Sequence, residues 1–244
     1  MSTGHQFMVN TRYEFLGESD QSQGLPHPHF ELPVDPSASL IPLPAPDSLD
    51  LEPMDVYALL TDRVTRRTYA DDPLSLAELS FLLWTTQGIK PVEIQHITRR
   101  TVPSAGSRHA FETLLLVNNV EELEPGLYRY VASAHALLRL DAPDNIAEQV
   151  TQACLNQNQV RTSAVTFAWF AVAYRMTYRY GERGYRYLHL DAGHVCQNLY
   201  LAAEAVACGV CAIAAFNDEA LNAALVLDGE DQFVVYVATV GKRR

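Results

Sequence analysis

The clearest hydrophobic pattern in the chain lies between residues 188 and 206. Its apolar positions step by four, three, four, three and four residues, the spacing of one face of an α-helix. They are Leu188, Ala192, Val195, Leu199, Ala202 and Val206. Asp191, His194 and Asn198 form a polar stripe beside this apolar face. The sequence therefore predicts a long central helix over residues 188–209, about 30 Å in length, with polar groups next to its buried side.

Shorter patterns predict three further helices and a set of strands. The helices are predicted over residues 54–63, 75–88 and 142–157. The second of them has the best-defined start, because Ser75 precedes a leucine-rich run and Glu78 follows three residues later, as in a capping box. Alternating or β-branched runs predict strands over residues 113–117, 126–131, 136–140, 164–174 and 232–240.

The N-terminal segment differs in composition from the rest of the chain. Between residues 24 and 53 it contains eight prolines: Pro26, Pro28, Pro33, Pro36, Pro42, Pro44, Pro46 and Pro53. Proline lacks an amide proton and has a fixed φ, so this segment is expected to run extended, where it could cover or bind a peptide. We therefore divide the chain into a proline-rich arm at residues 1–53 and one folded domain at residues 54–244.

Composition and charge narrow the class of protein. With 244 residues, 48% of them hydrophobic and 19% charged, the chain resembles globular proteins that fold without disulfides or metals. A net charge of −11 argues against binding to nucleic acids, whose phosphates attract cationic surfaces. Glu204 and Gly209 interrupt the most apolar window, so no membrane-spanning segment is predicted. The four cysteines show no secretory disulfide pattern, and we expect a cytoplasmic location.

The first candidate binding site is a basic turn at residues 63–69. Arg63 and Arg67 are four residues apart, with Thr65 between them, so a helical turn would direct both arginines to one ligand. Guanidinium groups bind phosphate in a bidentate manner, and a threonine hydroxyl adds another donor. This pattern favours a phosphate site, and the alternative is a solvated basic face paired with neighbouring aspartates.

The second candidate site is the small-residue segment 103–109. Ser104, Gly106 and Ser107 would let the backbone approach a ligand closely and would offer hydroxyl groups. An ordinary turn before a strand has the same composition. Neither the P-loop pattern nor the GxGxxG pattern occurs in the chain, so a nucleotide-like ligand would need another kind of site.

The third candidate site, residues 174–187, contains five tyrosines and four arginines. Tyrosine rings can stack on a flat heterocycle or donate a phenolic proton, and arginine can lie over an aromatic face. The same residue types are enriched at subunit interfaces, and both roles are compatible.

Two smaller groups follow in the chain. His194 and Asn198 lie one helical turn apart and are candidates for a hydrogen-bonded pair. Cys208 and Cys211 have zinc or redox spacing, but without a second pair they are better interpreted as small buried thiols. No metal site is predicted, because HExxH and its relatives do not occur.

Taken in order, four sequence blocks resemble the nitroreductase superfamily of flavin enzymes, most closely its SagB-type dehydrogenases, which oxidise azoline rings in modified peptides. The resemblance extends over residues 54–241. The blocks are Arg63-x-Thr65-x-Arg67-x-Tyr69, Pro103-Ser104-Ala105-Gly106, Gly126-Leu127-Tyr128-x-Tyr130 and Tyr180-Gly181-x-Arg183-Gly184-Tyr185-Arg186-Tyr187 followed by Asp191-Ala192-Gly193-His194-x-x-Gln197-Asn198. Their shared order and spacing carry the resemblance.

This resemblance implies an α+β fold with a central sheet flanked by helices, a long central helix and an intertwined homodimer that binds FMN at the subunit boundaries. It implies cofactor-binding roles for Arg63, Thr65, Arg67, Ser104, Gly106, Ser107, Ala214, Ala215, Lys242 and Arg244. The segment around Ser104 resembles the one that reaches the flavin from the partner chain. The loop at residues 212–216 resembles the one that faces flavin N5.

The resemblance also implies a catalytic pair, Arg179 and Tyr180, where azoline-oxidising relatives carry Lys-Tyr. Because arginine keeps its proton, Tyr180 is expected to act as acid or base and Arg179 to stabilise negative charge. The expected function is FMN-dependent oxidation of a peptide azoline or a similar substrate, with a cyclodehydratase as a candidate partner. The alternatives are an NAD(P)H-dependent nitroreductase or quinone reductase and a flavin-free peptide-binding scaffold.

Overall fold

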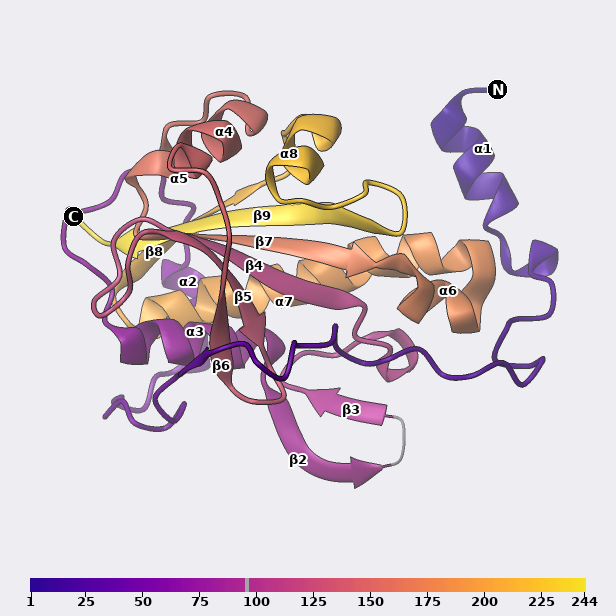
Figure 1. The fold of residues 1–244 in the computed structure, drawn as a ribbon, viewed down its shortest axis with the longest axis horizontal. Coiled ribbons are helices and arrows are strands. Elements are labelled where there is room, and N and C mark those ends of the chain that lie inside the picture. The colour runs from indigo at the N-terminus through magenta and orange to yellow at the C-terminus, as the bar shows by residue number, and fades with distance from the viewer. Residues whose placement is uncertain (95–96) are drawn as a thin grey trace.

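The computed structural model describes residues 1–94 and 97–244 and contains a seven-stranded antiparallel sheet (Figure 1). The strands lie in the order β1-β6-β5-β4-β7-β9-β8. Their bounds are Leu40–Pro42 (β1), Phe111–Val117 (β4), Gly126–Val131 (β5), Ala136–Leu140 (β6), Val165–Val172 (β7), Cys208–Ile213 (β8) and Gln232–Lys242 (β9). The predicted strands at 126–131 and 136–140 are confirmed, and β7, the aromatic and β-branched run, pairs with β4 and β9 inside the sheet.

Helices cover both faces of the sheet (Figure 1). α3 (Leu76–Gln87) and α7 (Gly184–Ala205) pack on one face, and α4 (Ile146–Ala153), α5 (Gln159–Thr162) and α8 (Asp218–Ala224) pack on the other. Alternate residues of a strand point to opposite faces, so Leu115 and Phe167 join the first core and Leu114 and Ala168 join the second. The expected α+β class, with a central sheet flanked by helices, is confirmed.

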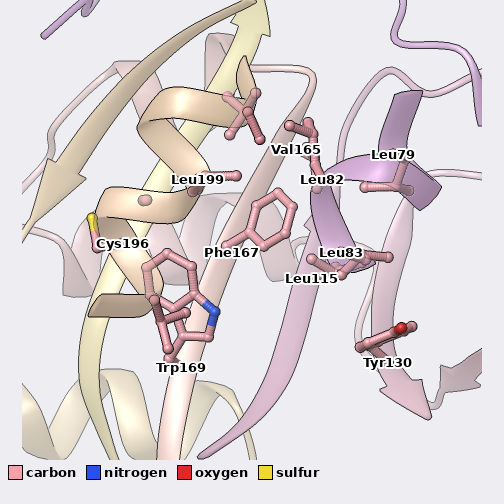
Figure 2. Close-up of a cluster of buried hydrophobic side chains, with 14 of the residues drawn as sticks. Leu79, Leu82, Leu83, Leu115, Tyr130, Val165, Phe167, Trp169, Cys196 and Leu199 are labelled. Carbon is pink, nitrogen blue, oxygen red and sulfur yellow. The ribbon is translucent and has the colours of Figure 1, made fainter. Parts of the chain in front are cut away.

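The core between α3, α7 and the sheet holds the long helix in place. Figure 2 shows Leu82 and Leu83 of α3 and Leu199 of α7 around Phe167 and Trp169 of β7. All five side chains are fully buried, and each contributes about 1.5–3 kcal/mol by removing apolar surface from water. Because this core fixes the rotation of α7, it also fixes where the polar residues beside the apolar face point.

The remaining elements are shorter. They are α1 (Thr3–Asn10), η1 (Tyr13–Phe15), α2 (Val56–Asp62), a hairpin of β2 (Ile89–Ile94) and β3 (Ile97–Arg100), η2 (Ala105–Ser107), α6 (Ala173–Tyr180) and η3 (Gly181–Arg183). The capping box predicted at the start of α3 is present, with Ser75 and Glu78 each bonded to the other's backbone. Within the described residues, none of the helices combines the length and the apolar character that crossing a bilayer needs.

The proline-rich segment forms part of the fold. Between residues 24 and 53 the chain forms no helix, as predicted, and β1 extends the sheet by pairing with β6. Leu43 is buried, and Leu49 and Leu51 pack against the core. The segment therefore runs along the sheet as a strap (Figure 1).

Three predicted elements had wrong boundaries. The central helix ends at Ala205 and not at residue 209, because Ala207 adopts a positive φ of 52° and Cys208–Ile213 pairs with β9 as strand β8. The strand predicted over 164–174 ends at Val172, where the chain turns into helix α6. The helix predicted over 142–157 spans only Ile146–Ala153. Short apolar runs do not distinguish helix from strand, and here backbone pairing with β9 decided the outcome for β8.

Candidate functional site

The basic turn is attached to the last two strands of the sheet. Thr65 forms a parallel bridge with Val210 of β8, and the Arg66 amide donates to the Val210 carbonyl at 2.9 Å. The Ala70 amide donates to the Lys242 carbonyl at 2.9 Å. Backbone pairing thus holds the turn against β8 and against the C-terminal end of β9.

Tyr200 of α7 organises the side chains of this turn. The Arg63 guanidinium lies over the Tyr200 ring, 5.4 Å from its centroid, and Thr65 Oγ1 is 3.1 Å from the Tyr200 hydroxyl. The same hydroxyl accepts a hydrogen bond from the Ala212 amide at 3.0 Å. A hydroxyl that accepts from an amide can donate its own proton to Thr65, which leaves the Thr65 proton available to a ligand.

We name Arg63, Thr65, Arg67 and Tyr200 the cationic cluster. Thr65 and Arg67 are exposed, and the Arg67 side chain also reaches the Cys211 thiol. Tyr200 was not among the residues predicted from the sequence. It follows the apolar stripe at Leu199 and carried no separate signal of its own.

The C-terminal tail lies beside the cationic cluster. Arg244 Nε donates to the Tyr69 carbonyl at 2.7 Å, so this residue is next to the basic turn. The Lys242 ammonium forms an ion pair with Glu78, which also belongs to the capping box of α3. The tail therefore lies next to the basic turn, and the charge of Lys242 is compensated by Glu78 inside the protein.

Ala214 and Ala215 follow directly after β8 and are exposed. Gln157 Nε2 donates to the Ala215 carbonyl at 2.9 Å. Since the Ala212 amide is bonded to Tyr200, this loop leaves β8 at the cationic cluster.

The second and third candidate segments meet at the other end of α7. Gly106 has a φ of +55°, and a Cβ added to it would lie 2.5 Å from the Tyr180 hydroxyl and 3.2 Å from Cδ and Cζ of Arg179. The Arg179 guanidinium lies 5.5 Å from the centroid of the Tyr180 ring. Tyr187 packs edge-on against the same ring, with centroids 4.8 Å apart. We name Gly106, Arg179, Tyr180 and Tyr187 the tyrosine cluster.

The turn that carries Gly106 is bonded to α7. The Ala105 amide donates to Asp191 Oδ1 at 3.2 Å, and the Ser104 side chain also hydrogen-bonds this carboxylate. Ser104 Oγ accepts from the His109 amide at 2.9 Å, and the Ser107 amide donates to the Ser104 carbonyl at 3.0 Å. Asp191 was seen in the sequence only as a member of the polar stripe.

Most other tyrosines and arginines of the third segment bind the N-terminal arm. Tyr178 donates its hydroxyl proton to the Leu25 carbonyl at 2.8 Å. Arg175 Nε donates to the His29 carbonyl at 2.7 Å. Arg183 and Arg186 both bond to Thr11. Arg179 and Tyr180 are thus the part of this segment that faces the Gly106 turn.

The remaining candidate residues make contacts within the fold or are buried in it. Asn198 Nδ2 donates to the Thr85 carbonyl at 2.8 Å, and His194 Nδ1 lies 4.0 Å from Asp191 Oδ1, so the suggested His194–Asn198 pair is not formed. Cys208 is buried in β8, and burial raises the pKa of its thiol to about 12. Among the described residues, no three His, Cys, Asp or Glu side chains are grouped as metal ligands would be.

The two clusters lie at different levels of α7. Asp191 and Tyr200 are nine residues apart on this helix, which is about 14 Å along its axis. A small ligand bound at one cluster of a chain is therefore well separated from the other cluster of that chain.

Sequence comparisons place the chain among known proteins. The family model described as the nitroreductase family matches residues 60–242. A protein of Methanocaldococcus jannaschii named as a nitroreductase is 29% identical over 194 residues, which are 80% of this chain and 94% of the relative. The trifolitoxin-processing protein TfxB of Rhizobium leguminosarum is 30% identical over 110 residues, 43% of this chain and 30% of the relative.

Solved structures share the fold. A protein of Anabaena variabilis named as a nitroreductase superposes with a TM-score of 0.65 and 31% identity over 76% of this chain, which spans only 37% of that chain. The microcin synthetase complex of E. coli matches with a TM-score of 0.62 and 18% identity over 88% of this chain and 78% of that one. A nitroreductase-named protein of Desulfovibrio desulfuricans in complex with FMN matches at 0.56 and 18%, covering 79% and 88%.

The family match spans both clusters, from the basic turn to the end of β9. The sheet, the long helix and the order of the sequence blocks agree with it. This chain belongs to the nitroreductase family of oxidoreductases.

Proposed function

We propose that this chain is an FMN-dependent oxidoreductase whose flavin lies between the cationic cluster of one copy and the tyrosine cluster of a second copy. One observation carries the proposal: the cationic cluster contains hydrogen-bond donors that remain free to bind a ligand. Among the described residues, neither Arg63 nor Arg67 forms an ion pair with a carboxylate. The Thr65 hydroxyl proton is also unused when Tyr200 acts as its donor.

The monophosphate of FMN suits this donor set. Two guanidinium groups offer paired N–H donors and permanent charge, which match phosphate oxygens better than lysine does. Arg244 is exposed and uses Nε for the Tyr69 carbonyl, so its terminal nitrogens add further donors. Lys242 contributes less directly, because its ammonium is paired with Glu78.

The loop after β8 is the proposed support for the flavin ring. Ala214 and Ala215 are exposed and small, which allows a planar group to approach the backbone. The structure in complex with FMN from Desulfovibrio desulfuricans has the same fold and supports the choice of cofactor.

The other side of the ring is assigned to a second copy of the chain. Ser104, Gly106 and Ser107 lie with Tyr180 at the other level of α7, about 14 Å from Tyr200 along the helix. A C2 dimer that brings this level of one chain to the cationic cluster of the other completes two equal sites.

When bound, FMN would supply the two-electron oxidant for the reaction, and the residues of this chain would hold and orient the substrate beside it. Tyr180 removes the proton that leaves the substrate, because its hydroxyl is held at a defined position by Gly106. Arg179 keeps its proton and stabilises the negative charge that develops beside it.

The substrate we propose is an azoline ring in a modified peptide. The trifolitoxin-processing relative and the microcin synthetase structure, which contains a truncated microcin precursor, support a peptide substrate. By the same likeness, a cyclodehydratase that forms the ring is the proposed partner. The Arg179–Tyr180 pair offers one cation and one phenol for this chemistry.

The visible spectrum of the purified protein, before and after addition of FMN, tests the cofactor. We expect Arg63→Ala to weaken FMN retention at least tenfold, since it removes a charged donor worth about 1.5–3 kcal/mol. Arg161→Ala is the matched control, because Arg161 is exposed and bonds only to Asn158 among the described residues. Tyr180→Phe should retain FMN and slow turnover. Equal retention by Arg63→Ala and Arg161→Ala would contradict the site.

The same purified protein also distinguishes the alternative functions. The Methanocaldococcus relative, which matches 80% of the chain, favours a nitroreductase as the second candidate. Steady NADPH consumption with a nitroaromatic acceptor, without oxidation of an azoline peptide, would support that function. A colourless protein that takes up no FMN would contradict both enzymatic functions and support a peptide-binding scaffold.

A further inference from the structure

The Tyr180 hydroxyl is held from several sides. Gly106 leaves it room that any larger residue would fill, since an added Cβ would lie 2.5 Å from the hydroxyl oxygen. Arg179 lies over one face of the ring, and Tyr187 packs edge-on against it. The position of the Tyr180 hydroxyl therefore depends on where the Gly106 turn lies.

The position of that turn depends on one carboxylate of α7. Asp191 receives hydrogen bonds from the Ala105 amide and from the Ser104 side chain, the two residues that precede Gly106. Ser104 Oγ also accepts from the His109 amide, so this hydroxyl links both ends of the turn to the helix.

Asp191 is an unusual residue for the buried side of a helix. Its side chain is 5% exposed, and its second oxygen, Oδ2, has no hydrogen-bond partner among the described residues. A buried polar atom without a partner costs about 1–3 kcal/mol. This unfavourable burial is offset by the contacts of the other oxygen, Oδ1, which binds the Ser104–Gly106 turn.

We infer that Asp191 is a positioning residue, which holds the Ser104–Gly106 turn and, through Gly106, sets the position of the Tyr180 hydroxyl. This inference rests on the proposed function in one respect: Tyr180 is taken as the group that moves the substrate proton. It assigns Asp191 no contact with FMN. The phosphate donors of the cationic cluster lie about 14 Å farther along α7 of the same chain, so Asp191→Ala should leave phosphate binding intact and should affect FMN only through the Ser104–Gly106 turn that faces the flavin of the second copy.

Hydrogen exchange of the protein without FMN tests the anchor directly. In Asp191→Ala the Ala105 amide loses its acceptor, and we expect exchange in residues 103–109 to become at least about tenfold faster. Asp191→Asn keeps an oxygen acceptor and should restore most of the protection. Gln197→Ala, at an exposed position of the same helix, is the control and should match the original protein. Unchanged exchange in Asp191→Ala would overturn the inference.

NMR of isotopically labelled tyrosine measures the second step, again without FMN. The Tyr180 signal should shift in Asp191→Ala and in Gly106→Ala, and it should stay near its original place in Asp191→Asn. If Asp191→Ala does not fold, Ser104→Ala removes one of the two bonds and should give a smaller shift in the same direction. A Tyr180 signal that does not shift in any of these variants would overturn the proposed link between Asp191 and Tyr180.

Turnover distinguishes positioning from general destabilisation. With FMN bound and substrate saturating, Asp191→Ala should lower kcat by about 10- to 100-fold, the size expected for a misplaced catalytic group. KM should stay within about threefold, and Asp191→Asn should recover most of kcat. A loss confined to KM would contradict the assignment. A protein that binds no FMN would refute the proposed function, yet exchange and NMR would still decide whether Asp191 holds the turn.

Discussion

Glu112 and Arg175 form an ion pair inside the protein, beneath the N-terminal arm. Arg175 Nη2 lies 2.6 Å from Glu112 Oε1, and both side chains are 2% exposed. Glu112 also accepts a hydrogen bond from the Leu32 amide at 2.7 Å. Because a buried charge is strongly unfavourable without its partner, each of these residues requires the other.

Replacing Glu112 by alanine should lower the free energy of unfolding by about 3–5 kcal/mol, since the Arg175 guanidinium would remain buried without a counter-ion. Urea denaturation measures this change. The control is Glu14→Ala, which breaks the pair between Arg12 and Glu14, where the side chains are 54% and 65% exposed. The control should change stability by less than about 1 kcal/mol. Equal losses in the two variants would contradict the prediction.

His109 makes stability depend on pH. Burial and the neighbouring Arg100 lower the pKa of His109 from 6.5 to about 3. Below pH 6.5 the unfolded chain takes up a proton that the folded protein does not, so the free energy of unfolding falls as the pH is lowered towards 3. The slope from this residue is at most about 1.4 kcal/mol per pH unit.

The His109 contribution can be isolated by comparing the original protein with His109→Asn, which also tolerates the positive φ of 44° at this position. Between pH 7 and pH 5 the original protein should lose about 2 kcal/mol more than the variant. Urea denaturation at the two pH values gives both numbers. Parallel losses would show that His109 titrates normally in the folded protein.

At the scale of elements, the N-terminal arm is a structural partner of buried arginines. Its backbone carbonyls accept from three of them: His29 from Arg175 at 2.7 Å, Phe30 from Arg100 at 3.2 Å and Pro33 from Arg129 at 3.0 Å. All three arginines are buried. The prolines keep this strap extended, so that its carbonyls point outward from the chain and not into a helix.

Deleting residues 1–34 should therefore destabilise the protein by several kcal/mol, because each hydrogen bond to a charged group contributes about 1.5–3 kcal/mol. Deleting residues 1–7 removes most of α1, which buries no residue, and should have little effect. Thermal or urea unfolding compares the two truncations. If both are as stable as the full chain, the arm does not stabilise the sheet and a role in covering substrate becomes the better explanation.

At the scale of the whole molecule, the proposed site needs two copies of the chain. Arg63 belongs to the cationic cluster and Tyr180 to the tyrosine cluster, and α7 separates them within one chain. In a C2 dimer each site would take Arg63 from one copy and Tyr180 from the other.

Co-expression of Arg63→Ala and Tyr180→Phe chains tests this arrangement. A mixed dimer would contain one site with both changes and one site with neither, so random assembly should recover about a quarter of the original activity. Each variant alone should be nearly inactive at limiting FMN. Activity that stays at the level of the single variants would place both residues in the same site of the same chain.

Much of the architecture could be predicted from the chain alone. The helix periodicity from Leu188 onwards, the capping box at Ser75 and the strands at 126–131 and 136–140 depend on local spacing, and local spacing is visible in a sequence. The family blocks indicated the basic turn and the Arg179–Tyr180 pair for the same reason. The limits of α7, β7 and β8 were missed, because similar apolar residues fit a helix or a strand until a neighbouring strand pairs with them.

Local spacing along the chain therefore specifies which segments are apolar, where they turn and which residues can carry charge or protons. Contacts between elements specify which of these residues meet. Tyr200 contacts Arg63 and Thr65, Asp191 hydrogen-bonds the turn that carries Gly106, and Glu78 forms an ion pair with Lys242. These contacts join residues far apart in the chain, and the packing of α7 and the pairing of β8 with β9 bring them together. No local pattern records such contacts, because they depend on the distance between elements and not on spacing within one.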